Sequence, residues 1–118
     1  MGERPAILLI EPPFHRLFHD RYSLDRYPLA LGYLAGVVRR DTNWNVITHN
    51  ADFVPDSQWI RVEHLAGKGY EQYIRRLKTH DAPAWTDLRR VLDSTRPDVV
   101  AVSVKTQTSA SAAVVARL

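Results

Sequence analysis

The apolar run AILLI, residues 6–10, is followed directly by Glu11 and two prolines. An unbroken run of branched apolar residues is typical of a strand that is buried on both faces at the centre of a parallel sheet. A strand covered on only one face would alternate apolar and polar side chains. We therefore predict that the chain folds around a central parallel strand at this position.

The next segments supply a helix and a second strand. Residues 27–41, YPLALGYLAGVVRRD, place apolar side chains at helical spacing, and Pro28 suits the start of a helix. Residues 44–50, WNVITHN, alternate in part, as expected of a strand near the edge of a sheet. Residues 51–69 have no clean period, and we predict a long excursion there with at most one short helix.

The second half of the chain continues the alternation of helices and strands. Residues 70–80 and 82–96 each place apolar side chains on one helical face, and Pro97 ends the second of these helices. Residues 98–104, DVVAVSV, predict another buried strand. Residues 105–118 are predicted to form a polar turn, KTQT, and then a helix rich in small residues.

These segments predict an α/β fold: a flavodoxin-like, Rossmann-like open parallel sheet with the strand order 2-1-3. Such sheets usually have about five or six strands, and the sequence supplies three. We interpret residues 1–118 as one domain, an N-terminal fragment of a longer protein that is truncated on the C-terminal side of its sheet. The exposed edge of the sheet would allow two copies to dimerise.

Composition excludes several classes of function. Apolar residues make up 45% and charged residues 25%, as in globular proteins, and the formal charge of +3 is spread along the chain without a basic run. We therefore expect no nucleic-acid partner. The absence of cysteine excludes thiolate-bound zinc and iron–sulfur clusters within these residues. No apolar run is long enough for a signal peptide or a membrane span, so we expect a cytoplasmic protein without a membrane partner.

A ligand of an open parallel sheet binds beyond the carboxyl ends of the strands, where the strand order reverses. With the order 2-1-3, this point lies between the loop EPPFHRLFHDRYSLDRYP and the loop KTQT. No glycine lies between Gly2 and Gly32, which excludes the phosphate-binding glycine motifs after the first strand. The prolines and aromatic residues, among them Phe14, Phe18 and Tyr27, indicate instead a large, flat and mostly apolar ligand.

Three segments carry a resemblance to a known family: ILLIEPP, YPLALGYLAGVVRR with a strand that ends at HNADF, and RPDVVAVSVKTQT. In order and spacing they resemble the N-terminal cobalamin (vitamin B12)-binding domain of cobalamin-dependent radical SAM enzymes. The resemblance implies a flavodoxin-like domain that holds the corrin over the carboxyl edge of its sheet. It also implies a separate downstream domain, absent from this chain, that carries a [4Fe-4S] cluster and cleaves S-adenosylmethionine.

The resemblance assigns a cobalamin-binding role to residues of the two loops and no catalytic residue or metal ligand within this chain. Cobalamin domains of the methionine-synthase type bind cobalt through the histidine of a D-x-H-x-x-G motif. Here His15 comes one residue too late after Glu11 for that motif. The residues predicted to bind the cofactor are Glu11, Pro12, Pro13, Phe14, His15, Leu17, Phe18, Ser103, Lys105, Thr106, Gln107 and Thr108.

The resemblance therefore implies the cobalamin-binding module of a radical SAM methyltransferase, or of a related enzyme that forms C–C bonds or rings. This chain alone would not be the enzyme. Its partners would be its own C-terminal radical SAM domain and a small-molecule substrate. The alternative is a non-catalytic sensor or regulatory domain that uses the same sheet to bind a tetrapyrrole or a protein partner.

Overall fold

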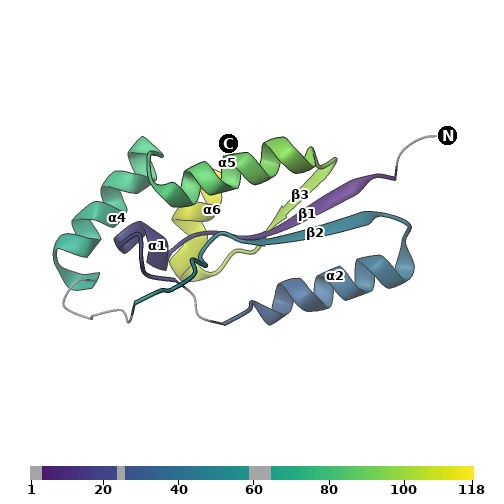
Figure 1. Ribbon diagram of the computed structural model, residues 1–118, viewed down its shortest axis with the longest axis horizontal. Helices are drawn as coiled ribbons and strands as arrows, with labels where there is room; N and C mark the ends of the chain where they lie inside the picture. The colour runs from purple at the N-terminus through teal and green to yellow at the C-terminus, as the bar shows by residue number, and fades with distance from the viewer. Residues whose placement is uncertain (1–3, 24–25, 59–64) are drawn as a thin grey trace.

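The computed structural model describes residues 4–23, 26–58 and 65–118. Its centre is a parallel sheet in the order β2-β1-β3, so the predicted α/β class and strand order are confirmed (Figure 1). This all-parallel order, with helices on the sheet, is consistent with a flavodoxin-like arrangement. The strands are β1 Ala6–Glu11, β2 Asn45–Asn50 and β3 Val99–Val102.

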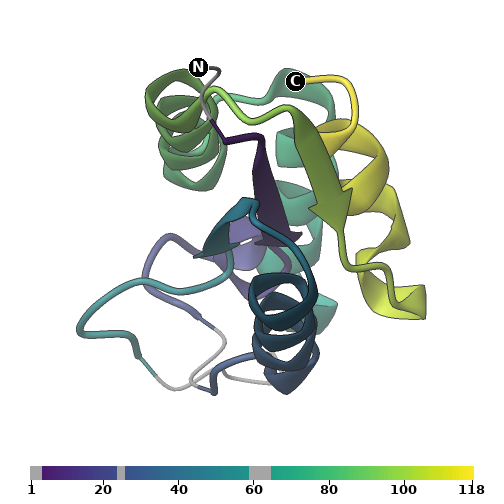
Figure 2. The ribbon, with the colours of Figure 1, turned by 90° about the vertical axis from the view of Figure 1, so that its right-hand side faces the viewer.

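The helices pack on both faces of this sheet. Figures 1 and 2 show α5 on one side of the strands and α2 on the other, while α1 and α4 lie beyond the carboxyl end of β1. Side chains of α4, α5 and α6 share one apolar cluster with β1, which places these three helices on the same side of the core. The described helices are α1 His15–Phe18, α2 Leu29–Asp41, α4 Lys68–Thr79, α5 Pro83–Thr95 and α6 Ser109–Val115.

The two apolar layers explain why β1 has an unbroken apolar sequence. Leu8 and Ile10 are fully buried in the larger cluster, together with Trp85 of α5. Leu9, between them in the chain, belongs to a second cluster with Leu31 of α2. Because successive side chains of a strand point to opposite faces, a strand covered by helices on both sides needs apolar residues at every position.

Proline residues lie at the start of two helices and just after the end of one. Pro28 is the N-cap of α2, and Pro83 is the first residue of α5, where a missing backbone N–H has no cost. α5 ends at Thr95, and Arg96 takes a left-handed conformation with φ of 43° before Pro97. The polar turn after β3 is a short 3-10 helix at Thr106–Thr108.

Two predictions differ from the structure. Residues 15–18, predicted to lie in a loop, form the one-turn helix α1, which is too short to produce an apolar period. The strand at 98–104 was predicted to be buried, but Val99 and Val100 are 40% and 42% exposed. β3 pairs with β1 on one side, and no described strand covers its other edge. Of the segment 51–69, predicted to be an excursion, residues 59–64 lie outside the described residues.

No helix in the described ranges has both the length and the apolar character needed to cross a bilayer.

Candidate functional site

The carboxyl end of β1 is joined to the segments that follow both of its neighbours. Past the regular pairing, Ser103 N–H donates to Ile10 O at 2.9 Å, and Ala51 N–H donates to Glu11 O at 2.9 Å. The Lys105 ammonium then lies 3.2 Å from the Glu11 carboxylate, linking residues that are 94 positions apart. The predicted meeting of the loop after β1 with KTQT is therefore present, and a charged pair joins the two.

Glu11 is an unusual residue at this edge because its side chain is only 4% exposed. One carboxylate oxygen, Oε1, pairs with the half-exposed Lys105, whereas Oε2 is buried and has no hydrogen-bond partner within residues 4–23, 26–58 and 65–118. Buried carboxylate oxygens are normally paired, since an unpaired one retains the full cost of its lost hydration. Oε2 is therefore a free acceptor at the carboxyl edge of the sheet.

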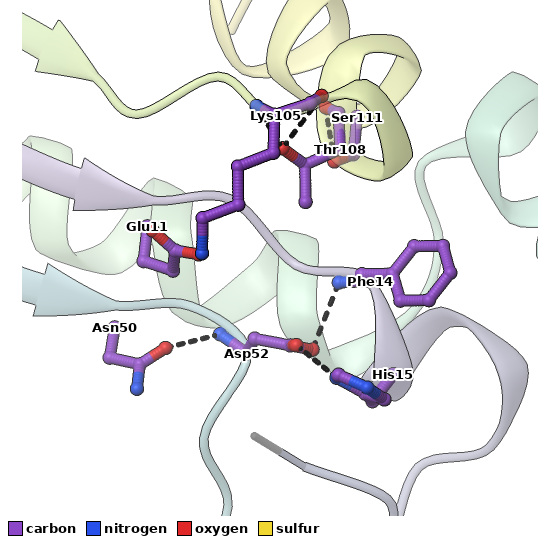
Figure 3. Close-up of polar contacts among 8 residues, drawn as sticks. All are labelled: Glu11, Phe14, His15, Asn50, Asp52, Lys105, Thr108 and Ser111. Carbon is purple, nitrogen blue, oxygen red and sulfur yellow. Dashed lines mark hydrogen bonds and ion pairs between the residues drawn. The ribbon is translucent and has the colours of Figure 1, made fainter. Parts of the chain in front are cut away.

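A second buried carboxylate, Asp52, organises the start of α1 (Figure 3). Its Oδ1 accepts hydrogen bonds from the backbone N–H groups of Phe14, at 2.9 Å, and Arg16, at 3.1 Å. These are amides at a helix N-terminus, which have no partner within the helix. The Asn50 side chain in turn accepts from Asp52 N–H at 3.1 Å, which fixes the turn after β2. Asp52 thus acts as an N-cap supplied from the turn after β2.

The same carboxylate holds His15. Its Oδ2 lies 2.6 Å from His15 Nδ1, and the two side chains are 3% and 20% exposed respectively. A carboxylate at Nδ1 accepts the proton on that nitrogen, and in the neutral ring the lone pair is then on Nε2. Nε2 has no partner among the described residues. The arrangement can accept a proton or bind a metal ion through Nε2.

The loop after β3 uses some of its predicted ligand-binding groups for its own structure. Lys105 N–H donates to Thr108 Oγ1 at 2.9 Å, and Ser111 Oγ donates to Thr108 O at 3.1 Å. Thr108 is buried by these contacts, whereas Thr106 and Gln107 are exposed. The hydroxyl of Thr108 therefore closes the turn, and the two residues before it are open to a ligand.

The apolar residues of the predicted site lie mainly in the core. Pro12, Pro13 and Leu17 are fully buried, and Phe18 stacks on Tyr73 of α4 with ring centroids 4.6 Å apart. Contact of these side chains with a ligand would require the packing between α1 and α4 to open. Their role in cofactor binding, like that of the half-buried Phe14 and Ser103, stays a prediction.

Asp52 was not predicted from the sequence, although a signal was present. It follows the predicted strand 44–50 by two residues, so it had to lie at the same carboxyl edge as Glu11. Arg16 was also missed. It is buried, donates to Ala51 O at 3.0 Å and pairs with Asp87 of α5 at 2.8 Å. Nothing in the spacing of its neighbours predicts these distant partners.

The described part of the chain contains no group of three or more His, Cys, Asp or Glu side chains that could hold a metal ion. Comparison of the chain with protein-family models, with curated proteins and with solved structures finds no match.

Proposed function

We propose that this chain is a corrinoid-binding module, with cobalamin held at the carboxyl edge of β1 and β3. The observation that carries the proposal is His15, whose Nδ1 lies 2.6 Å from the buried Asp52 carboxylate while Nε2 has no partner among the described residues. A histidine that binds a metal usually gives its other ring nitrogen to a carboxylate or a carbonyl group, which fixes the ring.

The number of available ligands favours a corrin over a bare metal ion. A zinc ion in a protein is held by three or four side-chain ligands. No such group occurs among the described residues. A corrin brings its own nitrogen ligands to its cobalt, so a single histidine of the protein would be enough to hold it. His15 would be that histidine, a role that the spacing of the D-x-H-x-x-G motif did not assign to it.

The polar groups of the two loops suit the rim of a corrin, which carries amide side chains. Glu11 Oε2 is a buried acceptor without a partner, and an amide N–H could satisfy it. Lys105 is 53% exposed, and Thr106 and Gln107 are exposed beside it. Val104, also exposed, offers apolar surface on the same loop. These groups would hold the corrin, while the predicted apolar floor of Leu17 and Phe18 is engaged in the core.

Bound cobalamin would supply methyl-transfer or one-electron chemistry at its cobalt. The work of this chain would be to bind and orient it, because in cofactor proteins the reactive chemistry belongs to the cofactor. The Asp52 carboxylate would keep the His15 ring in one orientation. In the full protein the catalytic partner would be a radical SAM domain with S-adenosylmethionine and a [4Fe-4S] cluster, acting as a methyltransferase or cyclase on a small molecule.

The direct test is titration of the purified chain with hydroxocobalamin, followed by visible absorbance and gel filtration. We expect saturable one-to-one binding and co-elution. His15→Ala should change the absorbance of the complex and weaken binding, whereas His19→Ala, at the other end of α1, is the matched control. Failure of the folded chain to co-elute at high micromolar concentration would contradict the proposal.

The alternative, a regulatory domain that binds a tetrapyrrole or a protein partner, shares the same sheet edge. Sequencing the full gene separates the two functions. A C-x-x-x-C-x-x-C motif downstream favours the enzyme, and a signalling or DNA-binding domain favours the sensor.

A further inference from the structure

A cavity separate from the proposed corrin site lies along the outer edge of β2. Its volume is about 640 Å³, within the range of about 300–1,000 Å³ that small-molecule pockets usually have. It is bounded by β2, α1, α5 and the segments before α2 and after β2. Neither His15 nor Lys105 lines it. The cavity is therefore large enough for a small organic molecule of its own.

Positive charge exceeds negative charge in its lining. Arg16, Arg26 and Arg90 line the cavity, and Asp87 is the one carboxylate among the described lining residues. Asp87 is already shared, since its oxygens lie 2.8 Å from Arg16 Nη2 and 3.5 Å from Arg90 Nη1. Three guanidinium groups and one carboxylate among the described lining residues leave uncompensated positive charge, which favours an anionic ligand.

Two buried polar atoms of the lining residues have no hydrogen-bond partner in the part of the chain that the structure describes. They are Arg16 Nε, on a side chain that is 5% exposed, and His49 Nε2. Burial lowers the pKa of His49, so this imidazole is neutral at the edge of the cavity and can donate or accept one hydrogen bond. A ligand oxygen that reached either atom would remove the cost of its unmade hydrogen bond.

The remaining lining supplies apolar surface. Tyr27 and Phe53 are about half exposed, and Val91 of α5 lies on the same cavity. Aromatic side chains contact a planar ring well, and arginine side chains also stack on aromatic faces. The combination of exposed rings with excess guanidinium groups suits a flat molecule that carries a negative charge.

From this geometry we infer that the cavity at the edge of β2 binds a small aromatic carboxylate. Its carboxylate meets the exposed Arg90 beside the buried charge of Arg16, and its ring lies against Tyr27 and Phe53. Ala51 O and Asp87 hold both terminal nitrogens of the Arg16 guanidinium group, so this charge is fixed beside the cavity. The inference does not depend on corrin binding.

The test uses 2-naphthoate as the probe and the neutral 2-naphthamide as its matched control, each titrated into the full chain by calorimetry without any corrinoid. We expect one-to-one binding of naphthoate and at least about tenfold weaker binding of the amide, as for loss of a hydrogen bond between charged groups. Arg90→Gln should weaken naphthoate binding about tenfold. Arg89→Gln removes an exposed neighbouring charge that does not line the cavity and should have no effect.

Asp87→Asn gives a result of the opposite sign. The amide oxygen of the new asparagine can still accept from Arg16, while the one competing negative charge among the described lining residues is removed, so naphthoate binding should tighten. Circular dichroism shows whether this variant is folded. Because Arg90 is mostly exposed, Arg90→Gln should fold, and its effect on naphthoate binding tests the inference even if Asp87→Asn fails to fold. The inference is overturned if the folded chain does not bind naphthoate, if the amide binds equally well, or if Arg89→Gln and Arg90→Gln have the same effect.

Discussion

Asp52 and His15 are 37 residues apart in the chain, and the Asp52 carboxylate lies 2.6 Å from the His15 ring. The same carboxylate accepts the backbone N–H groups of Phe14 and Arg16. The Asp52 side chain, in the turn after β2, therefore caps the first turn of α1 and also orients His15. A substitution of Asp52 should therefore destabilise α1 and also release the His15 ring from its fixed orientation.

Asp52→Ala should lower the free energy of unfolding by about 2–3 kcal/mol, because it removes a cap and leaves buried amide donors without an acceptor. Urea unfolding followed by circular dichroism measures the change. Asp56→Asn, at an exposed position four residues along, is the control and should be close to neutral. A loss as small as that of the control would show that Asp52 does not stabilise α1.

The pair of Glu11 and Lys105 should show coupling in a double-mutant cycle. Lys105→Met leaves a buried carboxylate without its cation and should cost about 1–2 kcal/mol, at the low end for such pairs because the ammonium is half exposed. In Glu11→Gln the loss caused by Lys105→Met should largely disappear. Lys78→Met, on the exposed face of α4, is the control. Strictly additive losses in the double variant would rule out the coupling.

His49 should make stability depend on pH on the acid side. Burial is the main cause that lowers its pKa from the ordinary value of 6.5; Arg16 lowers it further and Asp87 raises it. With a lower pKa in the folded state, the unfolded chain takes up the proton first as the pH falls. The contribution of His49 is therefore absent well above pH 6.5 and destabilises the fold below it.

Unfolding experiments across this pH range should show a smaller loss of stability in His49→Gln than in the native chain. The comparison isolates His49 because the other histidines remain in both proteins. Equal slopes of the free energy of unfolding against pH would contradict the assignment.

The sequence predicted the parts of this fold that depend on local pattern. The unbroken apolar run at residues 6–10 indicates a central strand with helices on both faces, and the partial alternation at residues 44–50 indicates a strand nearer the edge, as the order β2-β1-β3 confirms. Contacts between distant residues leave no local pattern. α1 has only one turn, and its cap, Asp52, comes from the turn after β2. Neither an apolar period nor a local capping motif in the sequence therefore predicts this helix. For the same reason the core packing of Leu17 and Phe18 against α4 could not be separated from a ligand-facing role.

The outer edge of β3 should promote association of two copies. Val99 and Val100 are about 40% exposed, and no described strand pairs with this edge. Exposed strand edges pair with other chains, and a lysine on the strand discourages this. Sedimentation should show concentration-dependent dimers that Val100→Lys reduces and Val37→Lys, on the exposed face of α2, does not. A strictly monomeric native chain would contradict this prediction.

The most direct test of the corrinoid proposal is the electron paramagnetic resonance spectrum of cob(II)inamide with the chain. Cobinamide lacks the nucleotide base of cobalamin, so any axial nitrogen must come from the protein. The proposal predicts that each cobalt line becomes a triplet, and a doublet when the chain contains ¹⁵N-labelled histidine. His15→Ala should abolish the splitting and His19→Ala should retain it. A spectrum without nitrogen splitting, or a splitting that persists in His15→Ala, would contradict the proposal.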